Sequence, residues 1–216
     1  MEEEEGIELV LDKYRKAGKI LAGIREEAIA KVKEGGLLVE VAEFVEQSIR
    51  ERGGEPAFPC NISLNEEAAH ATPSIADERV FGTELVKIDI GVHVDGYIGD
   101  SAVTVDLSGE HAELVRASEE ALNEAIRIIR DGVSTVELGE VIEHTIRAHG
   151  YKPIVNLSGH GLARYNSHAP PTIPNVRYEH GVLLRENDVV AIEPFATGGV
   201  GKVVESGTVE IYGLIK

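Results

Sequence analysis

The chain has 216 residues, of which 43% are hydrophobic, 27% charged and 5% aromatic, a composition typical of one folded domain or of two closely joined halves. Its 21 Lys and Arg residues against 38 Asp and Glu residues give a net charge of −17, which excludes nucleic acid as an expected partner. The single Cys60 excludes an internal disulfide, and no apolar run approaches the roughly 18 residues that a membrane span requires. We therefore expect a cytoplasmic protein without membrane binding, with Glu2 to Glu5 forming a solvated tail.

Apolar residues recur at helical spacing in four segments, and each segment stops near a glycine, the usual residue beyond a helix C-terminus. Other segments are rich in β-branched residues and predict strands. In chain order the predicted elements are helices over 17–32 and 41–49, strands over 87–94 and 97–105, helices over 114–129 and 136–146, and strands over 189–195 and 202–212. Helices and strands follow in blocks, which favours an α+β fold whose helices cover one face of a largely antiparallel sheet.

The sequence contains an internal repeat. Shifting the chain by 97 positions aligns residues 27–56 with 124–153 at 12 identities in 30, including two flanking glycines and Pro56 with Pro153. Two helices that shared only an amphipathic pattern would not share these flanking residues. We interpret residues 1–216 as one domain of two related halves, about 10–108 and 109–216, joined near Ser108 and Gly109.

The segment from Val86 to Ala102 predicts a hairpin with two carboxylates on one face. Asp95-Gly96, flanked by alternating apolar residues, is a strong signal for a two-residue turn. Pairing of Val94 with Tyr97 would put Asp89 opposite Ala102, with Asp100 as its diagonal neighbour. Diagonal Cα atoms lie ~7 to 8 Å apart, a separation suited to a shared metal ion. The alternative is two exposed Asp residues near a hairpin end, and His93, nearer the turn, is interpreted as a surface histidine.

A similar strand occurs in the second half. Residues 190–193 resemble residues 86–89 at a displacement of 104, so Glu193 corresponds to Asp89. A Glu inside an apolar strand requires a partner beyond solvent. The symmetry also predicts a counterpart of Asp100 on a later strand. The only acidic residues after Glu193 are Glu205 and Glu210, and neither lies in a local sequence that matches the surroundings of Asp100.

Three histidines lie among small residues. His160 is bracketed by glycines, His168 follows eight residues later, and His70 lies between alanines. Each alone could be a capped or surface histidine, but together with the carboxylates they form a donor set that suits Mn, Fe, Co or Zn. The remaining histidines, apart from His93, are interpreted as bystanders: His111, His144, His149 and His180.

Together these segments resemble the methionine aminopeptidases, the "pita-bread" metallopeptidases, and in particular their type 2 branch of archaea and eukaryotes. The resemblance runs from about Tyr14 to Phe195. It rests on Pro56-Ala57-Phe58-Pro59 with Asn61-Ile62-Ser63, Ala68-Ala69-His70-Ala71-Thr72-Pro73, Lys87-Ile88-Asp89, Asp100-Ser101-Ala102, Asn156-Leu157-Ser158-Gly159-His160-Gly161, His168-Ala169 and Ile192-Glu193-Pro194-Phe195.

The resemblance implies removal of the N-terminal methionine from nascent proteins and peptides by a monomeric enzyme that holds two divalent ions. By the same resemblance Asp89 would chelate one ion, Asp100 would bridge both, and His160 and Glu193 would hold the other. Glu193 would also take a proton from the attacking water. His70 and His168 would contact the cleaved peptide bond, and Phe58 would line an apolar pocket that suits a thioether.

The sequence departs from the family pattern at two places. Ser167 stands where the family usually has an apolar residue beside the methionine pocket. The chain ends at Lys216, before the family's C-terminal helical insertion and its last strand with a bridging Glu, so we expect a truncated reading frame of a normal enzyme, with a shortened form that keeps one weak metal site or none as the alternative. Two alternatives remain: a non-catalytic peptide- or partner-binding relative of the same fold, and a prolidase-like peptidase that cleaves Xaa-Pro bonds.

Overall fold

A computed structural model describes residues 6–205 and 211 of the chain. The described residues fall into two units: the first runs to Ser108 and includes Ala163–Ser167, and the second contains Gly109–Leu162 and the residues from His168 to 205. The boundary lies between Ser108 and Gly109, where the sequence repeat also divides the chain. Each unit is described on its own.

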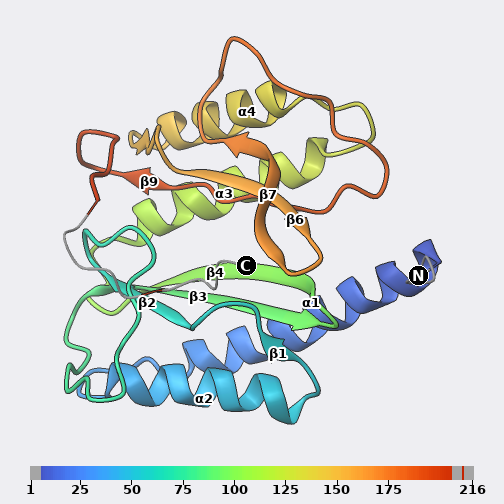
Figure 1. The fold of residues 1–216 in the computed structure, drawn as a ribbon. Helices are drawn as coiled ribbons and strands as arrows, with labels where there is room; N and C mark the ends of the chain where they lie inside the picture. The colour runs from blue at the N-terminus through green and yellow to red at the C-terminus, as the bar shows by residue number, and fades with distance from the viewer. Residues whose placement is uncertain (1–5, 206–210, 212–216) are drawn as a thin grey trace. The chain divides into compact units, whose positions relative to one another are not determined.

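In the first unit two helices cover one face of an antiparallel sheet (Figure 1). The helices are α1 (Ile7–Ile29) and α2 (Leu38–Glu51), and the strands are β1 (Glu55–Pro56), β2 (Asn61–Leu64), β3 (Leu85–Val94) and β4 (Tyr97–Asp106). Strand β3 is the inner strand, because β1 and β2 pair along one of its edges and β4 along the other.

Alternation along β3 separates the core from the opposite face of the sheet. Val86, Ile88, Ile90 and Val92 are fully buried and belong to the same apolar cluster as the buried residues of α1 and α2. The residues between them point to the other face, because successive strand side chains alternate. Lys87, Asp89, Gly91 and His93 therefore lie on the face away from the helices.

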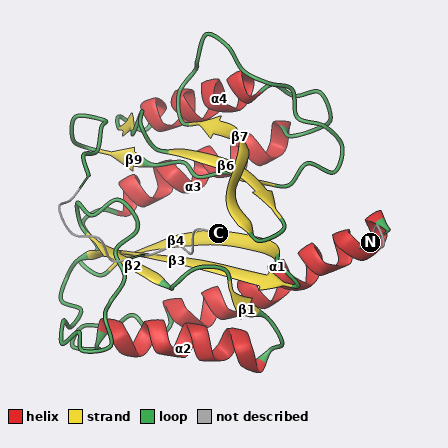
Figure 2. Cartoon of the chain, in the orientation of Figure 1, coloured by secondary structure: helices red, strands yellow, loops and turns green. Residues whose placement is uncertain are grey.

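The second unit repeats the helix pair. Its elements are α3 (Ala112–Ile128), α4 (Thr135–Ala148), β5 (Lys152–Pro153), most of β6 (Ser158–Ala163), most of β7 (Asn166–Pro174), β8 (Val190–Ala191) and β9 (Ala196–Thr197) (Figure 2). Strand β6 lies between β7 and β8, and β5 pairs with β9. Ser134 and Glu137 form a capping box that fixes the start of α4.

Equivalent backbone hydrogen bonds in the two units extend the repeat beyond the segments that match in sequence. Helices α2 and α4 have 14 residues each and begin 97 positions apart. The amide of Gly35 donates to the carbonyl of Phe81 at 2.7 Å, and the equivalent amide of Gly132 donates to the carbonyl of Leu184 at 2.8 Å. The two units therefore share a loop-to-helix connection that reaches Phe81 and Leu184, which lie outside the segments that match in sequence.

The α+β prediction and the predicted hairpin are confirmed. Asp95 and Gly96 both have positive φ, at 51° and 87°, as the two-residue turn requires, and Val94 pairs with Tyr97. All four predicted helices are present, although α1 begins at Ile7, ten residues before the predicted start.

Two strand predictions were less accurate. The predicted strand over 189–195 is wrong in extent: only Val190–Ala191 is a strand, and Pro194 lacks the amide that a longer ladder would use. The described residues 202–205 of the last predicted strand are not a strand, and most of its remainder lies outside the described residues. Strands β2, β6 and β7 were not predicted.

Within the described part of the chain, no helix combines the length and the apolar character needed to cross a membrane.

The buried thiol of Cys60 provides a test of the first unit. Its side chain is 2% exposed, and burial raises its pKa above the ordinary range. We expect the native chain to react with an aromatic disulfide reagent at least about 100-fold more slowly than the chain unfolded in guanidinium, since only local or global opening exposes the thiol. Absorbance of the released thiolate measures both rates. Equal rates would contradict the burial of Cys60 in the first unit.

Candidate metal centre

The first unit places two carboxylates on the open face of the β3–β4 hairpin. Asp89 pairs with Ala102 and Gly91 pairs with Asp100, so the two acidic residues are diagonal neighbours, as the sequence predicted. Both side chains are half-buried. Two carboxylates at this spacing repel each other, which raises the free energy of the folded chain, and a shared cation relieves the repulsion.

An aromatic ring lies directly beside these carboxylates. A Cβ built on Gly91 would lie 2.4 Å from Cε1 of Phe58, so the Phe58 ring occupies the space that any side chain at position 91 would need. The ring is held there because the amide of Ala57 donates to the carbonyl of Gly91 at 2.9 Å. An apolar surface therefore adjoins Asp89 along β3 and Asp100 across the hairpin.

A long loop carries His70 back to the edge of β2. The amide of Ile62 donates to the carbonyl of Ala71 at 2.7 Å, and the hydroxyl of Thr72 donates to the carbonyl of Cys60 at 2.9 Å. These bonds hold His70, which is exposed and has a φ of 63°, next to the strand that pairs with β3. Lys87 supports the start of the loop by donating to the carbonyl of Asn65, and burial lowers its pKa to about 8.

The second unit joins an imidazole to a carboxylate. Nε2 of His160 lies 2.8 Å from Oε1 of Glu193. His160 lies on β6 opposite Ala191 of β8, and Glu193 follows β8 by two residues, so the pairing of these strands creates the contact. The glycines on either side of His160 permit close packing: an added Cβ would lie 2.2 Å from the carbonyl of Ala191 at position 159, and 2.0 Å from the carbonyl of Pro170 at position 161.

His168 lies beside His160. The two rings meet edge to face, with centroids 4.5 Å apart, because β7 pairs with β6. The second unit thus brings together three of the predicted site residues, while the first brings together Asp89, Asp100 and Phe58 on one face and holds His70 at the adjoining edge. The donor atoms in the two sets, carboxylate oxygens and imidazole nitrogens, fit a divalent transition metal.

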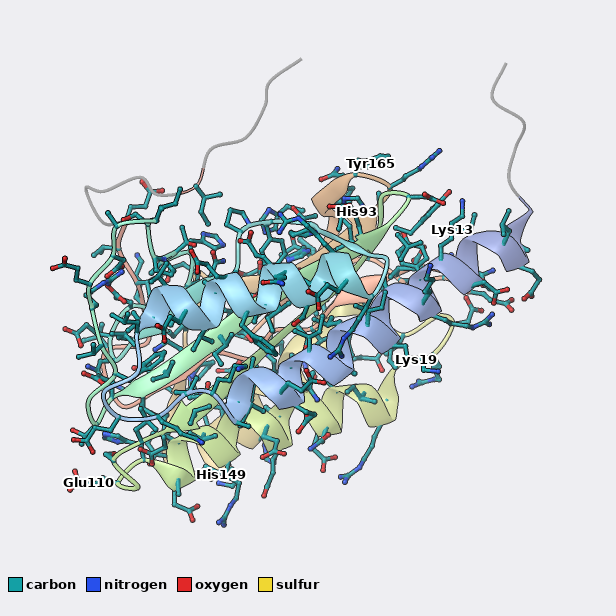
Figure 3. The ribbon with its side chains drawn as sticks, turned by 90° about the horizontal axis from the view of Figure 1, so that it is seen from below. Lys13, Lys19, His93, Glu110, His149 and Tyr165 are labelled. Carbon is teal, nitrogen blue, oxygen red and sulfur yellow. The ribbon has the colours of Figure 1, made fainter. Side chains whose placement is uncertain are left out.

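The other histidines have structural surroundings. Nδ1 of His93 accepts a hydrogen bond from the amide of Gly96 at 3.2 Å, and its ring meets Tyr165 edge to face (Figure 3). His149, at the end of α4, lies 2.9 Å from a carboxylate oxygen of Glu120 on α3. Neither His93 nor His149 was predicted from the sequence to bind metal.

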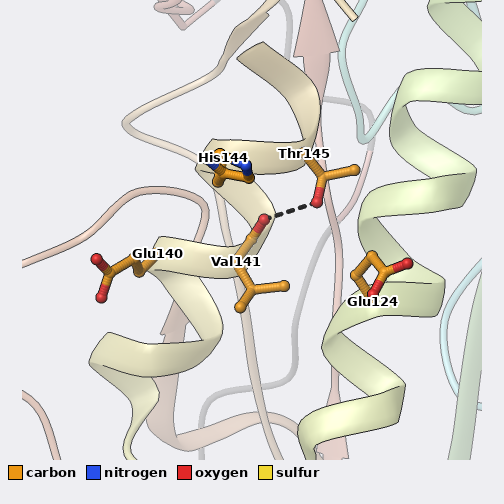
Figure 4. Close-up of a pocket in the computed structure, with 5 residues that line it drawn as sticks. All are labelled: Glu124, Glu140, Val141, His144 and Thr145. Carbon is orange, nitrogen blue, oxygen red and sulfur yellow. Dashed lines mark hydrogen bonds between the residues drawn. The ribbon is translucent and has the colours of Figure 1, made fainter. Parts of the chain in front are cut away.

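A groove of about 360 Å³ between α3 and α4 is separate from these residues. It is lined by Glu124, Glu140, Val141, His144 and Thr145 (Figure 4). The Thr145 hydroxyl donates to the carbonyl of Val141, Glu124 pairs with Arg127, and Glu140 pairs with Arg177. The carboxylates of this groove are thus held in ion pairs with arginines.

Sequence reasoning named Asn61 in a motif but assigned it no role beside Asp89. Asn61 of β2 pairs with Asp89 and is only 2% exposed. Its position could be recognised only after the register of β2 was known, since an Asn in a short apolar stretch carries no signal for a neighbour 28 residues away.

A family model described as metallopeptidase family M24 matches residues 12–213. The chain belongs to metallopeptidase family M24. A methionine aminopeptidase of Archaeoglobus fulgidus is 56% identical over 207 residues, which cover 95% of this chain and 71% of that one. A methionine aminopeptidase of Methanocaldococcus jannaschii is 50% identical, with 96% of this chain and 70% of that one covered.

Solved structures agree with this M24 assignment. The crystal structure of methionine aminopeptidase from Thermotoga maritima matches with a TM-score of 0.88 at 30% identity, covering 98% of this chain and 88% of that chain. The prolidase from Pyrococcus horikoshii matches with a TM-score of 0.73 at 28% identity, covering 85% and 53%. The pita-bread fold is therefore confirmed, and the M24 chain uses divalent metal ions.

Substitution of Asp100 tests whether the repulsion between Asp89 and Asp100 is relieved by a metal ion. We expect Asp100→Asn to leave the metal-free chain as stable as the parent or slightly more stable, since one of two like charges is removed. Manganese at about 100 times its Kd should stabilise the parent by about 2.7 kcal/mol, and the variant by less than about 1 kcal/mol.

Urea unfolding with and without manganese measures both effects. Asp106→Asn is the matched control, because Asp106 lies on the same strand but bonds to Ser108. Equal metal stabilisation of both variants would contradict a metal role for Asp100.

Proposed function

We propose that the chain is a methionyl aminopeptidase that hydrolyses the bond after an N-terminal methionine in peptides and nascent proteins. The observation that carries this proposal is the 56% identity to the methionine aminopeptidase of Archaeoglobus fulgidus over 95% of the chain. The chemistry of the side chains supports it, because the first unit has carboxylates on the strand pair that Phe58 adjoins, and the second unit joins an imidazole to a carboxylate.

We propose the following ligand roles from the family resemblance. Asp89 would hold one divalent ion, Asp100 would be shared by both ions, and His160 with Glu193 would hold the second. When bound, the ions lower the pKa of a coordinated water and bind the neutral amine of the substrate. The metal-free contact between His160 and Glu193 is consistent with these roles, since it holds both donors within 2.8 Å of each other.

The remaining roles belong to the chain's own side chains. Glu193 takes a proton from the attacking water, as a carboxylate within reach of the reacting atoms can do. His70 and His168 contact the cleaved peptide bond and stabilise the charge that develops on its oxygen. Phe58 forms the wall against which the methionine side chain packs, and an apolar wall suits a flexible thioether.

Cleavage of Xaa-Pro bonds is the second candidate. It is favoured by the fold match to the prolidases of Pyrococcus horikoshii and Pyrococcus furiosus, at TM-scores of 0.73 and 0.75. Those matches cover only 53% and 55% of the prolidase chains, whereas the Thermotoga maritima methionine aminopeptidase is covered over 88%. Removal of methionine is therefore the better supported activity. A cytoplasmic location and a monomeric state stay predictions.

The direct test is release of methionine from the peptide Met-Ala-Ser by the purified chain. We expect release with added manganese or cobalt, loss of release with a chelator, and a rate at least about 100-fold lower for Asp100→Asn. Ala-Pro and Ala-Ala-Ser are the comparison substrates, and amino-acid analysis gives the rates. Preferred cleavage of Ala-Pro would favour the prolidase-like alternative. Metal binding without any hydrolysis would favour a non-catalytic relative.

The contact between Phe58 and Gly91 predicts a specificity defect. Gly91→Ala places a methyl group where the ring now lies, so the ring must move into the substrate space. We expect KM for Met-Ala-Ser to rise about 10-fold with kcat changed less than about threefold, as for a change of one methyl group in a pocket. Gly18→Ala on α1 is the control, because nothing lies within 4 Å of an added Cβ there. An unchanged KM would contradict the proposed role of Phe58 in the methionine pocket.

A further inference from the structure

We propose that Asn61 is a positioning residue for the Asp89 carboxylate and sets the metal affinity of the first unit. This inference rests on the metal role proposed above for Asp89. It starts from a polar side chain that the fold buries on the carboxylate face and that the proposed reaction does not use.

Asn61 faces Asp89 directly across the strand pair. The two residues are register partners in the β2–β3 ladder, so their side chains point to the same face of the sheet. Nδ2 of Asn61 lies 3.4 Å from Oδ2 of Asp89. The distance is longer than the roughly 2.7–3.2 Å usual for an N–H···O bond, so the hydrogen bond is a weak one.

The orientation of the amide follows from charge. Oxygen and nitrogen of an Asn side chain are assigned from the surrounding hydrogen bonds. The opposite orientation would bring the Asn61 oxygen against an ionised carboxylate, which is repulsive. Asn61 is therefore a donor to Asp89, and the bond limits rotation of the carboxylate about its Cβ–Cγ axis.

The second amide atom indicates that stability is not the reason for Asn61. Its Oδ1 is one of three buried side-chain polar atoms without a hydrogen-bond partner among the described residues. A buried acceptor left unsatisfied destabilises the folded chain, whereas an apolar side chain of the same shape would not. A residue that costs stability while holding a metal ligand fits a role in ligand geometry, because ligating carboxylates are themselves oriented by hydrogen bonds.

The repeat supplies a comparison within the chain. A shift of 97 positions takes Asn61 to Ser158, and Ser63 to His160. The pairing agrees, since Ser63 pairs with Lys87 and His160 pairs with Ala191, which lies 104 positions after Lys87. A serine is therefore compatible with the backbone at the position equivalent to 61, which makes Asn61→Ser a conservative variant.

The experiment measures manganese affinity of the metal-free chain by calorimetry for the parent, Asn61→Leu, Asn61→Ser and Ser63→Ala. Ser63 is the matched control, since it is also 2% exposed and lies on the same strand and face but pairs with Lys87. We expect Asn61→Leu to weaken the affinity about 10- to 100-fold, with a smaller loss for Asn61→Ser and a change under about threefold for Ser63→Ala.

Thermal unfolding of the metal-free variants separates positioning from structural support. We expect Asn61→Leu to melt no lower than the parent, since it removes an unsatisfied acceptor. The visible absorption of bound cobalt should also change in this variant. A lowered melting temperature with unchanged manganese affinity would overturn the proposal. If Asn61→Leu does not fold, the same comparison applies to Asn61→Ser.

The outcomes also separate this inference from the proposed function. A parent chain that binds no manganese would contradict the metal centre itself. A parent chain that binds manganese with the same affinity as both Asn61 variants would contradict only the role of Asn61.

Discussion

The register between β3 and β4 is the constraint on which the carboxylate face depends. A two-residue turn leaves only one pairing of the strands, and that pairing makes Asp89 and Asp100 diagonal neighbours. A slip of one residue in either strand would turn that strand's carboxylate into the apolar core beneath α1 and α2, where an unpaired charge is very costly. The fully buried residues Ile88 and Ile90 therefore fix the site as firmly as the acidic residues do.

The second unit solves the same placement problem differently. Strand β6, which carries His160, packs closely between two neighbouring backbones, and only glycine fits on either side of His160. The imidazole is thus positioned by close backbone packing, whereas the carboxylates of the first unit are positioned by hairpin register. In both units the backbone positions the predicted site residues, and the residues next to them in the sequence determine the path of that backbone.

Much of this arrangement could be predicted from the sequence, because the decisive signals were local. The Asp95-Gly96 turn fixed the relation of Asp89 to Asp100, and the glycine stops fixed the ends of α2 and α4 to within a few residues. Strands β6 and β7 escaped prediction because glycines and the Pro170-Pro171 pair weaken any β signal. The roles of the site residues stay predictions, since their chemistry was inferred from resemblance.

The hydrogen bonds that repeat between Gly35 and Phe81 and between Gly132 and Leu184 join main-chain atoms only. Side chains at many corresponding positions consequently differ, as Ser63 and His160 do, although 12 of the 30 aligned positions keep the same residue. Two copies of one ancestral half, once fused into a single gene, could accumulate different donors while keeping the same scaffold. A symmetric dimer of identical halves could not, because every substitution would occur twice.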